Sequence, residues 1–148
     1  MDLHLDFREL LEYFNARGVE YLVVGGYALA AHGAPRYTGD LDLFVRPTAE
    51  NAKRILDALH DFGFGSLDLA ESDFDRPGGI VQLGVEPWRV DLITRISGVT
   101  WEEAAHSPME VHWGVPIKVI GRLQLIANKR STGRPKDAVD ADRLEGVA

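Results

Sequence analysis

Residues 24–45 read VGGYALAAHGAPRYTGDLDLFV, and this stretch contains the pattern that decides the fold. The apolar, partly β-branched run at 21–24 predicts a buried strand that ends at Gly25 and Gly26, and an alanine-rich helix follows it. A loop then leads to residues 40–45, where polar and apolar side chains alternate as in a strand with one buried face. The stretch therefore predicts a strand, a glycine turn, a short helix, a loop and a second strand in direct succession.

The flanking sequence adds further helices and strands to this unit. Apolar side chains recur at helical spacing near the N-terminus, and Thr48 is a suitable N-cap for the next helix. We expect helices at 7–17, 49–62, 101–106, 122–129 and 137–144, and strands at 80–83, 88–93 and 115–120. This order predicts an α+β fold in which a small mixed β-sheet of about five strands is flanked by helices.

The length of 148 residues suits a single domain, 1–148, with a core at about 20–95 and a basic C-terminal part at 111–148. The absence of cysteine excludes a disulfide framework, a thiolate zinc site and a cysteine nucleophile. The N-terminal segment is charged, and no apolar run is long enough to cross a membrane. We therefore expect a cytoplasmic protein without a membrane partner.

The charge is unevenly distributed along the chain. The formal net charge of −7 argues against an extended, non-specific grip on nucleic acid, because phosphate contacts need Lys and Arg. The stretch 111–136 nevertheless contains no acidic residue and carries Lys118, Arg122, Lys129, Arg130, Arg134 and Lys136. This segregation predicts that the C-terminal part forms the side of the protein that meets a nucleotide or an RNA acceptor.

Asp40 and Asp42 are the first candidate catalytic residues. They lie two positions apart on a predicted strand, so their side chains point to the same face, while Leu41 and Leu43 hold the other face in the core. The two carboxylates repel each other, and a hard cation such as Mg²⁺ or Mn²⁺, which prefers carboxylate and phosphate oxygens, would relieve that repulsion. The alternative interpretation is a solvated strand whose outer face is acidic.

Asp91 is a third candidate, and the glycine pair is a fourth element. If the strand that carries Val90 and Leu92 lies beside residues 40–45, Asp91 joins the first two acids. The alternative is that Asp91 pairs with Arg89, its neighbour on the same face. Glycines between a strand and a helix let backbone N–H groups approach a phosphate closely, although a simple tight turn has the same sequence.

In this order the elements resemble the nucleotidyltransferase superfamily, whose core is that of DNA polymerase β. The family pattern is an apolar residue with Gly-Gly or Gly-Ser, then Asp-apolar-Asp-apolar, then apolar-Asp-apolar, here matched at 24–26, 40–43 and 90–92. The closer resemblance is to small bacterial members that read Gly-Gly-x-Ala and Arg-x-Thr-x-Asp-apolar-Asp, here 25–28 and 36–42. Some of those relatives are toxins of the abortive-infection type.

The resemblance implies a role for each matched residue. Gly25 and Gly26 would bind the phosphates of a nucleoside triphosphate (NTP), and Asp40, Asp42 and Asp91 would be catalytic and hold the metal. Arg36 and Thr38 would belong to the nucleotide-binding residues: Arg36 would contact the triphosphate or hold Asp42, and Thr38 would bond the loop backbone. The alternative for both is an ordinary surface loop.

The resemblance extends more loosely to the C-terminal part. Lys129 matches a family lysine and would bind the nucleotide, although a cation near a helix C-terminus is favoured by the helix dipole in any case. Arg134, Lys136 and Asp137 match an Arg-x-Lys-Asp pattern. Arg130, Arg134 and Lys136 are candidates to line a groove for the acceptor.

The sequence thus predicts an enzyme that moves a nucleoside monophosphate from an NTP to a hydroxyl of RNA such as tRNA, of a protein or of a small molecule. Pyrophosphate would be released, and the protein would be one component of a toxin–antitoxin pair. A dimer or a cognate partner would complete the site. The alternative function is a regulatory, non-catalytic module of the same fold that binds nucleotide or a partner, as an antitoxin does.

Overall fold

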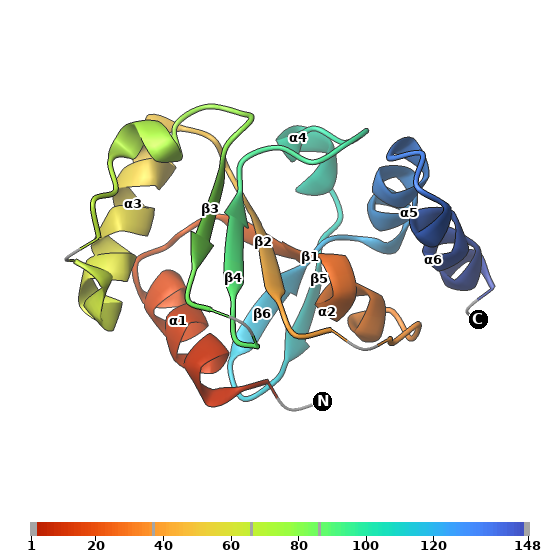
Figure 1. Ribbon diagram of the computed structural model, residues 1–148, viewed down its shortest axis with the longest axis horizontal. Helices are drawn as coiled ribbons and strands as arrows, with labels where there is room; N and C mark the ends of the chain where they lie inside the picture. The colour runs from red at the N-terminus through yellow and green to blue at the C-terminus, as the bar shows by residue number, and fades with distance from the viewer. Residues whose placement is uncertain (1–2, 37, 66, 86, 147–148) are drawn as a thin grey trace.

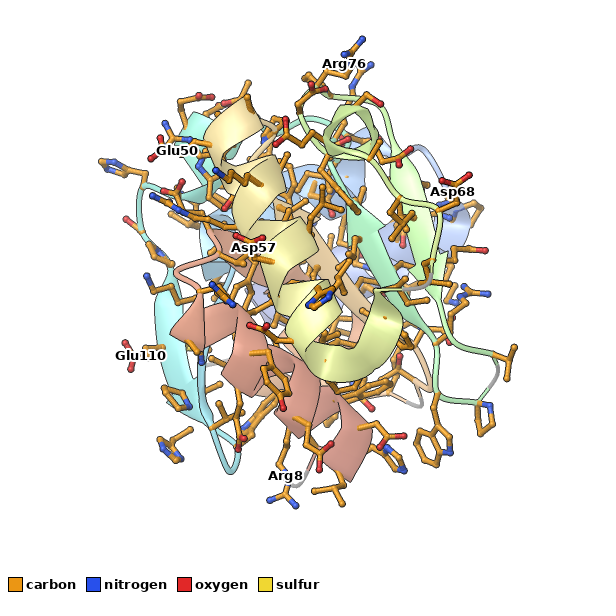
Figure 2. The ribbon with its side chains drawn as sticks, turned by 90° about the vertical axis from the view of Figure 1, so that its left-hand side faces the viewer. Arg8, Glu50, Asp57, Asp68, Arg76 and Glu110 are labelled. Atoms are coloured by element: carbon orange, nitrogen blue, oxygen red, sulfur yellow. The ribbon has the colours of Figure 1, made fainter. Side chains whose placement is uncertain are left out.

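The protein is built in three layers around one sheet. The computed structural model describes residues 3–36, 38–65, 67–85 and 87–146, so Tyr37 of the predicted Arg-x-Thr motif lies outside the described residues. The sheet stands between α1 and α3 on one side and α2, α5 and α6 on the other (Figure 1). Figure 2 shows α1 and α3 lying in front of the sheet, with acidic side chains such as Asp57 on their outer surface.

The described residues form a mixed sheet in the order β3-β4-β2-β1-β6-β5. Its strands are β1 (Tyr21–Val24), β2 (Leu41–Val45), β3 (Ile80–Leu83), β4 (Val90–Ile93), β5 (Met109–His112) and β6 (Pro116–Val119). β1 pairs with β6 and β2 with β4 in parallel, whereas the β1–β2, β3–β4 and β5–β6 pairs are antiparallel. The predicted α+β class and mixed sheet are confirmed, and the sheet gains β5, an edge strand outside the predicted set.

The helices begin and end close to the predicted positions. They are α1 (Leu5–Ala16), α2 (Gly25–Ala31), α3 (Ala49–Leu59), α4 (Trp101–Ala104), α5 (Arg122–Ser131) and α6 (Pro135–Glu145), with single turns at His60–Phe64 and Glu71–Asp73. Thr48 caps α3 as predicted, since its hydroxyl accepts a hydrogen bond from the Asn51 amide. No helix among the described residues is long and apolar enough to span a membrane.

The predicted apolar faces form the core. The helical stripe of α1 is buried as predicted, at Phe7, Leu10, Leu11 and Phe14. On β2, Leu41 and Leu43 are fully buried, which leaves the side chain of Asp42 on the opposite face. Burial of the leucines therefore fixes the direction in which the acid points.

The position of β2 in the sheet brings the glycine turn and the acids together. β2 lies between β1 and β4, with Val24 paired to Asp42 on one side and Asp91 paired to Asp42 on the other. Because α2 begins at Gly25, directly after Val24, its first turn starts next to Asp42. Segments that are far apart in the sequence thus meet at the end of three adjacent strands.

Candidate active site

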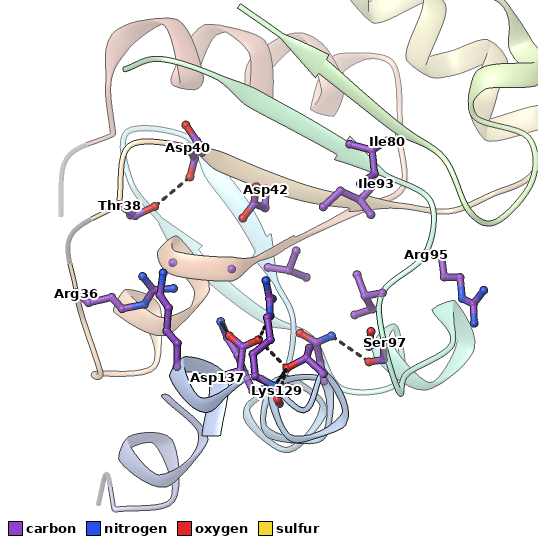
Figure 3. A pocket seen from close by; sticks show the side chains of 18 of the residues that line it. Arg36, Thr38, Asp40, Asp42, Ile80, Ile93, Arg95, Ser97, Lys129 and Asp137 are labelled. Atoms are coloured by element: carbon purple, nitrogen blue, oxygen red, sulfur yellow. Dashed lines mark hydrogen bonds and ion pairs between the residues drawn. The ribbon is translucent and has the colours of Figure 1, made fainter. Parts of the chain in front are cut away.

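A cleft of about 680 Å³ lies between the ends of the central strands and the α5–α6 pair. Figure 3 shows Asp42 on the sheet side of this cleft, across from Lys129 and Asp137 on the helical side, while the carboxylate of Asp40 points away from these helices. Nine of the predicted site residues line it: Gly25, Gly26, Arg36, Thr38, Asp40, Asp42, Lys129, Arg134 and Lys136. The structure therefore gathers most of the candidates, from both halves of the sequence, around one space.

Asp91 stands next to the cleft rather than in its lining, and Arg89 holds it there. The guanidinium of Arg89 donates from Nε to Asp91 Oδ1 at 2.9 Å and from Nη2 to Asp91 Oδ2 at 3.3 Å. The same Nη2 donates to Asp40 Oδ2 at 2.8 Å. The expected juxtaposition of Asp91 with the first two acids and its pairing with Arg89 thus occur together.

The carboxyl group of Asp42 has a strongly raised pKa. Burial, together with the adjacent carboxylates of Asp91 and Asp40, raises the pKa of Asp42 to about 7. A carboxyl group with a pKa near neutrality, in a cleft and among like charges, is typical of a functional site rather than of a structural ion pair.

Gly25 and Gly26 each lack room for a side chain, but for different reasons. Gly25 has φ +69°, and a Cβ on it would overlap Asp42 Oδ2, so the backbone approaches this carboxylate more closely than any other residue would allow. A Cβ on Gly26 would lie 2.6 Å from Cβ and 2.7 Å from Oγ1 of Thr38. Thr38 also donates to the Asp40 carbonyl oxygen at 3.2 Å, which is the loop contact that the sequence predicted for it.

Lys129 is buried in an ion-pair network on the other side of the cleft. Its side chain is 7% exposed, and Nζ donates to Asp137 Oδ1 at 3.2 Å and to Asp140 Oδ2 at 3.3 Å. Burial acts to raise the pKa of Asp137, but hydrogen bonds and charge from Thr132, Lys129 and Arg134 outweigh it and lower that pKa. Lys129 therefore lines the cleft while its charge is already matched by two acids.

The loop before β2 is tied to α6 by two contacts. Arg36 Nε lies 3.3 Å from Asp140 Oδ2, so Arg36 is engaged by the network around Lys129 and not by Asp42. Arg143 Nη2 donates to the Pro35 carbonyl oxygen at 2.8 Å. These contacts couple the position of the C-terminal helix to the loop that leads into Asp40.

The remaining cations of the basic stretch divide into two groups. Arg134 lines the cleft and donates to Asp137 Oδ2 at 2.7 Å, and exposed Lys136 lines it without an ion pair among the described residues. Arg130 is outside the cleft lining, where it pairs with Asp142 and Glu145. Acids of α6 thus balance much of the basic charge that the composition suggested.

The sequence reasoning missed an apolar wall and one cation. Ile80, Ile93 and Ile96 line the cleft beside the acids, and Ile80 is 64% exposed. Arg95, at the end of β4, also lines it and makes no ion pair among the described residues. The sequence could have indicated Ile93, because residues two positions apart on a strand share a face and Ile93 therefore lies on the same face as Asp91.

The carboxylate oxygens of the acids are suitable ligands for a divalent cation, but they do not surround one position as a complete set of ligands. Asp40 Oδ1 is buried and has no hydrogen-bond partner, and Asp40 and Asp42 both line the cleft. Such an orphaned oxygen suits Mg²⁺ or Mn²⁺. No three His, Asp or Glu side chains in the described part of the chain are arranged as metal ligands, and Asp91 is engaged by Arg89.

Comparison with known proteins places the fold. No protein-family model and no curated protein sequence matches the chain. A protein from Thermotoga maritima assigned as a nucleotidyltransferase aligns over 95% of this chain and 88% of its own, with TM-score 0.59 and 15% identity. The lincosamide antibiotic adenylyltransferase LnuA, solved with lincomycin, aligns over 99% of both chains at TM-score 0.56 and 12% identity. The antibiotic-resistance factor ANT(2'')-Ia aligns over 94% of this chain and 80% of its own at TM-score 0.56 and 15% identity. The chain therefore has the α+β fold of nucleotidyltransferases.

Proposed function

We propose that this protein is a metal-dependent nucleotidyltransferase of the EC 2.7.7 type, which moves a nucleoside monophosphate from an NTP to a hydroxyl acceptor. The observation that carries the proposal is the position of Asp40 and Asp42. They line one cleft beside the Gly25–Gly26 turn, with Asp91 in register with Asp42 on the adjacent strand. The fold shared with nucleotidyltransferases supports it.

The chemistry is a substitution at the α-phosphorus. The acceptor oxygen forms a bond to this phosphorus, the bond to the oxygen that bridges the α- and β-phosphates breaks, and pyrophosphate leaves. The proton of the acceptor hydroxyl passes to Asp91, which lies in register with Asp42 on the adjacent strand. A bound Mg²⁺ or Mn²⁺, held by Asp40 and Asp42 and joined by Asp91, would neutralise phosphate charge.

The two sides of the cleft bind different parts of the NTP. The backbone at Gly25 and Gly26 and the hydroxyl of Thr38 meet the phosphates on the sheet side. Opposite the sheet, four cations line the cleft, Arg36, Lys129, Arg134 and Lys136, and they outnumber the two carboxylates of the network, Asp137 and Asp140. This excess of positive charge favours a polyanion.

The test uses each α-labelled NTP with Mg²⁺ or Mn²⁺ and follows pyrophosphate release and label transfer to tRNA and other RNA, to protein and to small hydroxyl compounds. LnuA acts on a lincosamide antibiotic, which is the reason to include small molecules among the acceptors. Asp42→Asn should lower transfer by at least about 100-fold, since even an outer partner of a metal ligand is worth 10–100-fold. Asp57→Asn, on the exposed surface of α3 far from the cleft, is the matched control and should retain full activity. Equal activity in Asp42→Asn and the control would refute the proposal.

The same experiment separates the enzyme from a regulatory module. If this protein is the toxin of a cytoplasmic toxin–antitoxin pair, its expression should slow cell growth, and Asp42→Asn should remove this effect. An antitoxin-like module should co-purify with a cognate partner and show no thermal shift with any NTP. A dimer that completes the site should elute at twice the monomer mass in size-exclusion chromatography and lose activity on dilution.

A further inference from the structure

Arg89 has an unusual position between two acids that the proposed function assigns to a metal. Among the described residues its guanidinium makes three hydrogen bonds, two to Asp91 and one to Asp40, at 2.8 to 3.3 Å. The side chains of Asp91 and Asp40 are 13% and 26% exposed, so these contacts are partly shielded from water. A planar guanidinium that spans two carboxylates in this way is among the stronger ionic contacts in proteins.

Other cations of the cleft lining pair with acids of α6, and neither Arg95 nor Lys136 pairs with Asp40, Asp42 or Asp91 among the described residues. Arg36 pairs with Asp140, and Lys129 pairs with Asp137 and Asp140. Among the described residues, Arg89 is the cation that hydrogen-bonds to Asp40 and Asp91. It therefore carries the charge balance of Asp40 and Asp91 when no other cation is bound.

Arg89 hydrogen-bonds to carboxylate oxygens that a metal ion would need as ligands. Asp40 Oδ1 is free of hydrogen-bond partners, whereas Asp40 Oδ2 and both oxygens of Asp91 face the guanidinium. Among the described residues, the three acids do not form a three-ligand metal site. Asp91 can turn toward a bound ion only when Arg89 releases it.

We propose that Arg89 is the resident cation of the acid cluster, and that a divalent ion binds by displacing its guanidinium from Asp40 and Asp91. Arg89 is then a positioning residue: it keeps the acids together in the metal-free protein and limits the affinity for metal. This inference rests on the proposed function, since it takes the acids to be the metal ligands.

The test is Mn²⁺ binding to the full chain without nucleotide, measured by electron paramagnetic resonance of free Mn²⁺ and by calorimetry. Arg89→Gln keeps the size of the side chain and removes its charge, so it should bind Mn²⁺ at least about tenfold more tightly than wild type. Its melting temperature without metal should fall, and the rise on adding Mn²⁺ should be larger than in wild type. Arg46→Gln, which breaks the ion pair with Glu20 at the far end of β2, is the control and should leave Mn²⁺ affinity unchanged.

A second variant and a second measurement distinguish a change in metal affinity from a loss of folding. Arg89→Lys keeps the charge but cannot span two carboxylates, so its Mn²⁺ affinity should lie between those of wild type and Arg89→Gln. In wild type, the Nε–H resonance of Arg89 should shift on titration with Mg²⁺. Equal or weaker Mn²⁺ binding in both Arg89 variants would overturn this inference and leave the proposed function intact. Absence of Mn²⁺ binding in every variant and in wild type would overturn both.

Discussion

Gly26 and Thr38 set how closely the glycine turn packs against the loop before β2. A Cβ on Gly26 would meet Thr38 at 2.6 Å, closer than two carbon atoms approach without displacement. Gly26→Ala should therefore lower the free energy of unfolding by about 1–3 kcal/mol, the usual cost of overpacking, and should weaken NTP binding. Chemical denaturation and a nucleotide thermal shift measure the two effects.

The control for this substitution is Gly146→Ala. Gly146 has φ −81°, and a Cβ there would have ordinary contacts at 3.6 and 3.7 Å, so stability should hardly change. In a Thr38→Gly background the cost of Gly26→Ala should shrink, because the clash partner is gone. An undiminished cost in that background would show that Thr38 is not the cause.

Asp42 makes the stability of the metal-free protein depend on pH. The pKa of Asp42 is raised from its ordinary value of 3.8 to about 7 by burial and the neighbouring acids. Between these values the folded protein keeps a proton that the unfolded chain has lost, so the contribution of Asp42 falls as pH rises from about 4 to 7 and is lost above 7. Asp42→Asn should remove this part of the pH dependence.

Denaturation curves at pH 5 and pH 8 check this expectation. At pH 8 without metal, Asp42→Asn should be more stable than wild type by about 2–4 kcal/mol, and the difference should shrink toward pH 4. The control Asp57→Asn replaces an exposed carboxylate on α3 and should follow the wild-type pH profile. A difference that is the same at both pH values would contradict the assigned pKa.

The α5–α6 pair contains two cations, one helical position apart, with opposite environments. Lys129 is 7% exposed and bonded to two buried acids, whereas Arg130 is 41% exposed and pairs with exposed Asp142 and Glu145. Lys129→Met should cost about 3–5 kcal/mol, because it leaves buried carboxylates without a partner. Arg130→Met should cost less than about 1 kcal/mol, as solvated ion pairs do.

Urea denaturation of both variants measures this contrast. Equal losses in the two variants would mean that the carboxylates around Lys129 find other partners. A Lys129→Met protein that is stable but no longer binds NTP would instead favour the direct role in nucleotide binding that the sequence resemblance implied.

Local patterns predicted most of the helices and strands. The alternation in residues 40–45, the glycine pair and the Thr48 cap each depend on neighbours a few residues away, and the structure confirms them. β5 was missed because Met109 and Val111 are only half buried and alternate with exposed Glu110 and His112 at the sheet edge. Such a short segment has little apolar signal of its own.

The side-chain pairing of the site could not be predicted in the same way. The sequence placed Asp40, Asp42 and Asp91 together through an assumed strand pairing, which the register of β2 with β4 confirms. The bridge from Arg89 to Asp40 and the capture of Lys129 by Asp137 and Asp140 depend on tertiary geometry. No periodicity in the chain encodes which of several nearby acids a cation will choose.

The C-terminal helix is also a support for the loop that leads into the acids. Arg143 bonds the carbonyl of Pro35, which lies 108 positions away in the sequence. Arg143→Gln should raise the amide exchange rates of Ala34 and Arg36 about fivefold, as expected for the loss of one hydrogen bond. Arg54→Gln removes a surface pair with Glu50 on α3 and serves as control. Unchanged exchange in Arg143→Gln would contradict the coupling.

The sheet order has a consequence for biosynthesis. β1 ends at residue 24, but β6, its parallel neighbour, begins at residue 116, so about 90 residues must be made before that edge is covered. At ribosomal speeds of about 5–20 residues per second, the apolar β1 edge waits several seconds for its partner. During that interval β1 pairs with β2 on one edge only, and its other edge is open to pairing with a strand of another chain.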